Sequence, residues 1–276
     1  MPPSGNSLEL TMRNVFPLSL IMVTPARLFR YFPREASNIF AKRELWFSSP
    51  ADFNDPFEAL PRNEDVLQQL VEQKLHEVWA LSDPHESFGT FKQKNEPKEE
   101  LLMAMCQETQ ADVQKQVSKR FHIACFSEEG TNLLMWAHYA SSHRGFVVEF
   151  DVRHDLFSSG DLYKVRYSAD RPSIPKLGQL LEPFLCKSLD WEYEAEYRLI
   201  REVKTLTPGG RLGPNRKDGT YDYFAPLPIE SVKSVFLGVR MPPADREEIL
   251  TSLQASDACH IRHTVLRPHP TKYMLK

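Results

Sequence analysis

Strand-like and helix-like apolar segments follow each other in an irregular order along the chain, and this order limits the possible folds. The run "GFVVEF" at 145–150 is typical of a buried strand, and "RFHIACFS" at 120–127 and "VKSVFLGV" at 232–239 resemble it. Between the strands, apolar residues recur at helical spacing over 66–81, and the segment 99–119 is typical of a second helix. Because strands and helices do not alternate regularly, the pattern favours an α+β fold over a doubly wound sheet.

The helical segments interrupt the series of strands, which predicts an insertion at about 62–119 within one core. A polar connector, 82–100, is expected to join the two helices as a flexible loop. Of the 276 residues, 41% are hydrophobic, which is enough for a sizeable core. We therefore expect a loose leader over 1–23 and a single α+β domain over 24–270.

The net charge and the apolar runs limit the possible binding partners and the cellular location of the protein. The 34 basic and 37 acidic residues give a net charge of -3, so no global basic field indicates nucleic-acid binding, although a local basic face remains open. The apolar run 16–23 is too short to span a bilayer, and the following residues indicate a first strand rather than a cleavage site. A cytoplasmic protein without membrane attachment is expected.

Several chemical motifs are missing from the sequence. No pair of the four cysteines has CxxC spacing, which argues against a zinc knuckle or a dithiol redox site. The sequence contains neither a G-x-S-x-G elbow nor a P-loop or dinucleotide-binding glycine pattern. His138 and His143 are five residues apart and would leave a common helix face, so no metal site is expected.

The segment "LDWEYEAEYRLIRE" at 189–202 concentrates negative charge. If it is a strand, Glu192, Glu194 and Glu196 share one face and repel each other, so positive charge must compensate. The nearby basic residues are Arg198, Arg201 and Lys204. Two interpretations remain open: a solvated edge that pairs with these residues, or a face that contacts a cationic or hydroxyl-rich ligand.

Five strings in this order resemble one bacterial family. They are "LWFSSPADFNDPFE", "IACFSEEGTNLLMWAHYASSHRGFVVEFD", "YKVRY", "WEYEAEYRLIR" and "VKSVFLGVR". Together they are similar to the family named domain of unknown function 2971, from about Leu28 to Val239. That family's name implies no activity.

A weaker resemblance concerns the ADP-ribosyltransferase superfamily, whose members cleave NAD at the nicotinamide bond. It implies a split, twisted sheet of mixed or antiparallel strands. By this resemblance, Arg30 and Tyr31 on the first strand would hold the nucleotide, and Ser127 would shape the nicotinamide pocket. Glu194 and Glu196 would match the E-x-E motif that contacts the ribose. The roles assigned to these residues in this way depend on an analogy at the level of the fold.

The resemblance and the residues together give a set of candidate roles. Glu196 is the expected catalytic carboxylate, and Glu194 is expected to position the acceptor or to prime its nucleophile. The segment "MWAHYASSHRGF" is expected to be a packing corner with Trp136 in the core and one polar side toward the cleft. The side chains on that polar side are His138, Tyr139 and His143.

The leading hypothesis is an NAD-consuming, ADP-ribosyltransferase-like enzyme that acts on a protein or nucleic-acid acceptor. A toxin or defence effector is one setting for such an enzyme. NAD would be its substrate, and no metal is expected. The turn residues Asn54, Asp55 and Glu58 are substrate-binding or structural candidates. The alternatives are a metal-dependent nuclease or hydrolase that uses Asp55, Glu58 and His138, and a non-enzymatic nucleotide-binding module. The sequence defines neither the acceptor nor the oligomeric state.

Overall fold

The computed structural model describes residues 25–82, 86–158, 161–173, 181–209, 222–258 and 260–276. The expected leader over 1–23 lies outside these residues. The described residues form helices and a mixed sheet, so the α+β class is confirmed. Among the described helices, none combines the length and the hydropathy that a membrane crossing requires.

The secondary structure follows the chain in this order. The α-helices are α1 (Ile39–Lys42), α2 (Glu64–Trp79), α3 (Phe88–Asn95), α4 (Glu99–Arg120), α5 (Leu133–Tyr139) and α6 (Pro243–Ala255). The first strands are β1 (Arg27–Phe32), β2 (Glu44–Phe47), β3 (Phe121–Ser127), β4 (Phe146–Asp151), β5 (Leu162–Lys164) and β6 (Arg166–Ser168). The later strands are β7 (Cys186–Ser188), β8 (Glu196–Glu202), β9 (Thr207–Gly209), β10 (Asp222–Pro226), β11 (Val232–Leu237) and β12 (Arg262–Val265).

The main sheet has the strand order β12-β11-β4-β1-β3-β8-β5 within the described residues. The pair of β11 and β12 is parallel, and the other neighbours are antiparallel. The register places Phe29 of β1 opposite Ser127 of β3, and Ser127 opposite Glu196 of β8. Three strands that are far apart in the sequence therefore bring these positions into one row.

The main sheet is covered on both faces, which explains why its central strands are apolar runs. In β4, Phe146, Val147 and Val148 are all fully buried. Val148 belongs to the main core, whereas Val147 packs in a second cluster with Trp136 of α5. Burial on both faces produces a continuous apolar run rather than an alternating one. Trp136 is 0% exposed, which confirms its prediction as a core residue.

A smaller sheet, with the order β2-β10-β9, lies beside the main sheet. The residue after β2, Ser48, exchanges two backbone hydrogen bonds of 2.9 Å with Ile123 of β3. A further pair, β6 and β7, is parallel. The segment after β2 therefore lies against β3, and Lys187 of β7 lies 3.5 Å from Glu196 of β8.

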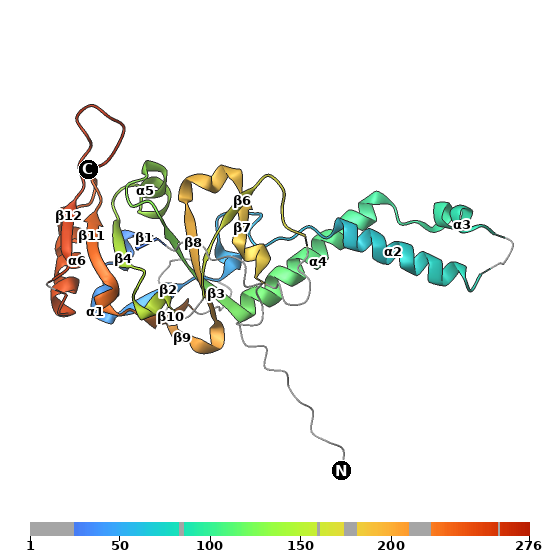
Figure 1. Cartoon of the computed structure of the whole chain (residues 1–276), viewed down its shortest axis with the longest axis horizontal. Helices are drawn as coiled ribbons and strands as arrows, with labels where there is room; N and C mark the ends of the chain where they lie inside the picture. Colours follow the sequence, from blue (N-terminus) through green and yellow to red (C-terminus); the bar gives the residue numbers. More distant parts are fainter. Residues whose placement is uncertain (1–24, 83–85, 159–160, 174–180, 210–221, 259) are drawn as a thin grey trace, which may run out of the picture.

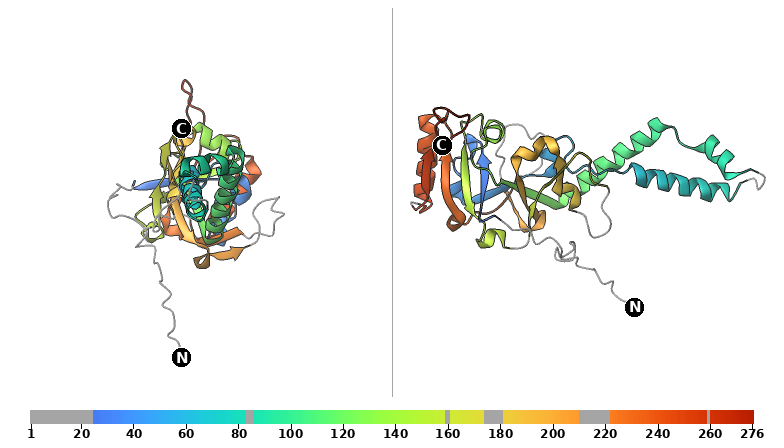
Figure 2. Two further views of the ribbon diagram at one scale, coloured as in Figure 1. Left: turned by 90° about the vertical axis from the view of Figure 1, so that its right-hand side faces the viewer. Right: turned by 45° about the horizontal axis from the view of Figure 1, so that its top comes forward.

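Helices α2, α3 and α4 form an arm that projects from the sheets (Figures 1 and 2). At its base, Asn63 hydrogen-bonds the carbonyl of Cys106 and the side chain of Gln110, both at 3.0 Å. The prediction of a loop over 82–100 is wrong, because α3 lies within that segment. The hydroxyl of Ser87 caps α3 by accepting from the Thr90 backbone N–H.

Candidate functional site

A cavity of about 350 Å³ lies where β1, β3 and the start of β8 meet. Strand β1 contributes Phe29, Arg30 and Tyr31 to its lining, and β3 contributes Cys125, Phe126 and Ser127. The segment from β2 onward contributes Trp46, Ser48, Asp52, Phe53 and Asn54. Met135, His138 and Tyr139 of α5 and Lys187, Glu194 and Glu196 complete it. The wall therefore combines aromatic rings with positive and negative charge.

Most of the side chains singled out from the sequence line this one cavity. They are Arg30, Tyr31, Asn54, Ser127, His138, Tyr139, Glu194 and Glu196. His143 does not line it, because the turn Ser141–His143 after α5 carries it toward a different hollow. Asp55 and Glu58 are buried in the turn that carries Asn54 and are also absent from the cavity wall.

The backbone before β8 differs from the strand considered for the acidic segment. Residues Leu189–Glu194 form a 3-10 helix, η6, and Ala195 follows with a left-handed conformation (φ 43°). Glu192 is exposed, whereas Glu194 and Glu196 are buried. A strand with three carboxylates on one face is therefore not formed, and two of the three carboxylates turn toward the cavity.

Arg198 compensates the charge of Glu196 from behind the cavity. Its Nε and Nη2 donate to the two carboxylate oxygens of Glu196, each at 2.9 Å. Its Nη1 and Nη2 donate to Glu58 at 2.5 and 3.0 Å. The Arg198 side chain is 0% exposed, so water competes with neither pair. The guanidinium thus connects the Asn54–Glu58 turn to β8 through two bidentate pairs.

Glu194 belongs to a second chain of polar contacts, which faces α5. Its Oε1 accepts a hydrogen bond of 2.5 Å from the Tyr139 hydroxyl, and its Oε2 lies 2.5 Å from Lys187 Nζ. The Asn54 amide in turn donates to the Tyr139 hydroxyl at 3.2 Å. Lys187 Nζ also lies 3.5 Å from Glu196, so it links the two carboxylates.

The two cavity carboxylates differ in acidity. Burial alone would raise the pKa of Glu196, but the positive charges of Arg198 and Lys187 outweigh it and hold this pKa at about 2. Burial and the neighbouring charge of Glu196 raise the pKa of Glu194 above its ordinary value. Paired groups with divergent pKa values are typical of a division between a permanent anion and a proton-transferring group.

Two buried donors on the cavity wall have no hydrogen-bond partner among the described residues. They are Arg30 Nη1 and Trp46 Nε1. Arg30 Nη2 donates to the Trp46 carbonyl at 2.6 Å. Burial lowers the pKa of Arg30 to about 10, so it stays charged at neutral pH. Because buried donors are normally satisfied, these two groups are candidates to donate to an anionic or carbonyl oxygen.

Ser127 and Tyr31 position the backbone around the cavity. The Ser127 hydroxyl donates to the Glu194 carbonyl at 2.6 Å and accepts from the Glu129 backbone N–H at 3.0 Å. The Tyr31 hydroxyl donates to the Glu129 carbonyl at 2.7 Å. Both hydroxyls are thus engaged with the protein's own backbone. They fix the loop after β3 against the turn that carries Glu194.

A metal site does not form from the residues considered for one. Among the described residues, no three His, Cys, Asp or Glu side chains group as metal ligands would. Glu58 is bound to Arg198, and the side-chain carboxylate of Asp55 accepts from the Phe57 backbone N–H at 2.9 Å. His138 lines the cavity without either of them.

Lys187 and Trp46 are two polar site residues that the sequence did not indicate. The need for positive charge near the three carboxylates was a usable signal for Lys187, which lies only seven residues before Glu194. Of the basic residues considered there, Arg201 pairs with Asp161 and Lys204 with Glu202. No sequence signal pointed to Trp46, because an indole in a strand is usually a packing residue.

Fold and site together define an α+β protein with a small, charged and aromatic cavity at the centre of its main sheet. Comparison with known proteins gives no match: no family model fits the chain, and no curated protein or solved structure is significantly similar to it.

Proposed function

We propose that the protein is an ADP-ribosyltransferase-like enzyme that binds NAD in this cavity and cleaves its nicotinamide–ribose bond. The observation that carries the proposal is that Arg30, Ser127 and the Glu194–Glu196 pair line one cavity, although they come from distant parts of the chain. A cation, flat aromatic walls and a pair of carboxylates are the groups that such a substrate requires.

In this proposal, the two unsatisfied donors on the cavity wall bind the negatively charged part of NAD. Arg30 Nη1 and Trp46 Nε1 would take oxygens of the pyrophosphate, and a planar guanidinium suits phosphate oxygens. The cavity volume of about 350 Å³ is near the lower end for small-molecule sites. It therefore suits the nicotinamide–ribose half of NAD, with the adenosine half outside. Aromatic side chains such as Tyr139 offer a surface for the nicotinamide ring.

The carboxylates supply the chemistry. When the bond from the ribose C1′ to nicotinamide breaks, both bonding electrons go to the ring nitrogen and neutral nicotinamide leaves. The ribose becomes an oxocarbenium-like cation, which the permanently ionised Glu196 stabilises. The acceptor's nucleophilic atom then bonds to C1′ and loses its proton to Glu194, whose pKa is raised. Tyr139 and Lys187 hold Glu194 in place.

The test is nicotinamide release from NAD by purified full-length protein, with and without cell lysate as a source of acceptors. Wild type is compared with Glu196→Gln and Glu58→Gln. Each variant removes one carboxylate from Arg198, but only Glu196 lines the cavity. We expect Glu196→Gln to lower the release rate at least about a hundredfold. Glu58→Gln should retain activity within about tenfold once both variants are shown to be folded.

Three outcomes would contradict the proposal in different ways. Equal losses in Glu196→Gln and Glu58→Gln would assign Glu196 a purely structural role. NAD binding by wild type without release under any condition would indicate a non-enzymatic nucleotide-binding module. Neither binding nor release would remove NAD as the ligand of this cavity.

A further inference from the structure

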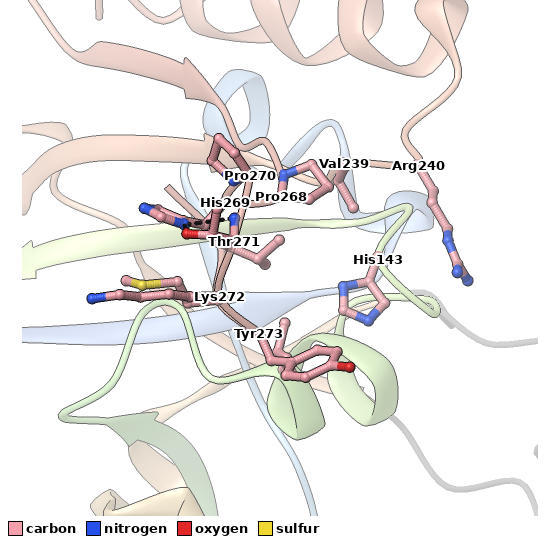
Figure 3. A pocket seen from close by; sticks show the side chains of 12 residues that line it. His143, Val239, Arg240, Pro268, His269, Pro270, Thr271, Lys272 and Tyr273 are labelled. Carbon is pink, nitrogen blue, oxygen red and sulfur yellow. Dashed lines mark hydrogen bonds between the residues drawn. The ribbon is translucent and has the colours of Figure 1, made fainter.

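A second hollow, of about 600 Å³, lies on the surface between the end of β11 and the C-terminal segment. It is lined by His143, Val239, Arg240 and Leu133 and by residues 268–275 (Figure 3). It is distinct from the cavity described above and shares no lining residue with it. Helix α5 connects the two sites, because its first residue, Leu133, faces the hollow and its last residue, Tyr139, faces the cavity.

The segment over the hollow is held in a defined shape. Arg267 and Lys276 exchange two backbone hydrogen bonds of 2.9 Å, and the His269 N–H donates to the Met274 carbonyl at 2.9 Å. Leu275 is buried in the cluster that contains Trp136. The loop at 268–274 is therefore anchored at its base, and the side chains of Lys272 and Tyr273 are exposed at its tip.

The charge of this region is strongly one-sided. Residues 258–276 contain four Lys or Arg residues and three His residues but no Asp or Glu, although the whole chain carries a net charge of -3. The hollow has no carboxylate in its lining. Arg240 and Lys272 are exposed, and neither forms an ion pair within the described part of the chain. These two cations are available to an anionic partner.

An aromatic ring accompanies the free cations. Tyr273 is fully exposed, at 101% of its reference area, and it lies on the wall of the hollow. Figure 3 shows Arg240 and Lys272 extending to opposite sides, with the Tyr273 ring on the side of His143. Exposed Tyr side chains beside free cations are the combination by which proteins bind single-stranded nucleic acid, through base stacking and phosphate contacts.

We infer that this hollow binds single-stranded nucleic acid, with a base stacked on Tyr273 and phosphates held by Arg240 and Lys272. The free cations alone would equally suit an acidic protein segment. The exposed ring and the hollow beside it favour a nucleic acid, because every base presents a flat face for stacking. An unpaired base is required, since a base within a duplex is already stacked. The inference does not depend on NAD cleavage in the cavity.

The test is fluorescence anisotropy of a labelled single-stranded 12-nucleotide probe, as DNA and as RNA, titrated with the full-length protein. The double variant Arg240→Glu/Lys272→Glu should weaken binding at least about tenfold and reduce the salt dependence by about 1.4 in the log–log slope. Tyr273→Ala should weaken binding to the single strand at least about fivefold, with little effect on a duplex probe. Melting curves confirm that the variants fold.

The matched control is Lys115→Glu/Lys119→Glu on α4, two exposed lysines without ion pairs among the described residues. It makes the same change of net charge far from the hollow and should leave binding within about twofold of wild type. Equal weakening by the control, or no binding at physiological salt, would overturn the inference. If polyglutamate displaced the labelled probe as strongly as unlabelled oligonucleotide does, and if Tyr273→Ala had no effect, the surface would instead be assigned to an acidic protein partner. Glu194→Gln should bind the probe normally, which separates this site from the cavity.

Discussion

Arg198 is the residue on which the two halves of the cavity depend. It holds Glu58 from the turn after β2 and Glu196 from β8, and all three side chains are almost fully buried. Two carboxylates in such a place are tolerated only while the guanidinium remains between them. The sequence showed that positive charge was needed near Glu196. It did not show that the same arginine also reaches Glu58, 140 positions earlier.

Arg198→Met should therefore destabilise the protein strongly. We expect a loss of about 3–5 kcal/mol in the free energy of unfolding, because two buried carboxylates lose their shared partner. Arg166→Met serves as the control, since Arg166 forms an exposed pair with Glu182 at 2.8 Å. Its loss should stay below about 1 kcal/mol. Urea denaturation measures the free energy of unfolding of both variants. Similar decreases in the two variants would contradict the structural importance of the Arg198 network.

The low pKa of Glu196 makes part of the stability dependent on pH. Because this pKa is about 2 in the folded protein and near 4.5 in the unfolded chain, Glu196 stabilises the fold above about pH 4.5. That contribution, roughly 3 kcal/mol, is lost as the pH falls from about 4.5 toward 2. Glu58 and Glu194, whose pKa values are raised mainly by burial, act in the opposite direction.

Comparison with Glu196→Gln isolates this contribution. The difference in free energy of unfolding between wild type and variant should be largest at pH 6 and should shrink steadily below pH 4.5. Urea denaturation at a series of pH values gives the difference directly. A difference that stays constant down to pH 3 would show that Glu196 is not held as a permanent anion.

At the scale of elements, close backbone contact fixes the connection from α5 into β4. A Cβ atom on Gly145 would lie 2.1 Å from the Phe32 carbonyl oxygen and 3.0 Å from Ala140. Only glycine fits there without moving β1 away from β4. The preceding residues, Ser141–His143, all have positive φ angles, so the turn after α5 is already constrained.

Gly145→Ala should destabilise the protein by about 3 kcal/mol or more, because the neighbouring atoms belong to the backbone and cannot move aside. Gly89→Ala in α3 is the control, since its nearest neighbour to an added Cβ lies 4.0 Å away. That change should be neutral or slightly stabilising, as expected for alanine in a helix. Thermal melting of both variants measures this difference in stability. If both variants melted at the wild-type temperature, the prediction for Gly145→Ala would be wrong.

The arm illustrates what the sequence could predict about individual elements. The helical spacing of apolar residues indicated α2, and the segment 99–119 was interpreted as a second helix, which corresponds to α4. Helix α3 was missed, since its segment is polar and Phe91 is its one buried apolar residue among those described. Ser87, a capping residue before "FGTF", was the available signal.

The arm should open more readily than the main sheet. Leu70, Val78, Leu101 and Met103 of α2 and α4 are more than half exposed, so little buried apolar area stabilises these helices. We expect the backbone amides of α2 and α4 to exchange with deuterium faster than those of β3 and β4. Hydrogen-exchange mass spectrometry measures this, and protection of the arm equal to that of β4 would show that another surface covers it.

At the scale of the whole molecule, the sequence predicted the fold class more completely than the site. Local apolar runs mark β3, β4 and β11, because burial on both faces of the sheet leaves few polar positions. The strand order depends on pairing between distant segments, which no local pattern encodes. The candidate cavity residues were identified mainly by motif and resemblance, and most of them line one cavity. His143 was assigned to the wrong surface because the turn Ser141–His143 could not be anticipated.

Binding of NAD to the cavity is measured by calorimetric titration of NAD into wild type, Arg30→Gln and Arg27→Gln. Both arginines lie on β1, but Arg30 lines the cavity with an unsatisfied nitrogen, whereas the Arg27 side chain is 68% exposed outside it. We predict that wild type binds NAD, that Arg27→Gln binds equally well and that Arg30→Gln binds at least about tenfold more weakly. Equal binding by all three proteins, or no binding by wild type, would contradict the assignment of this cavity as the nucleotide site.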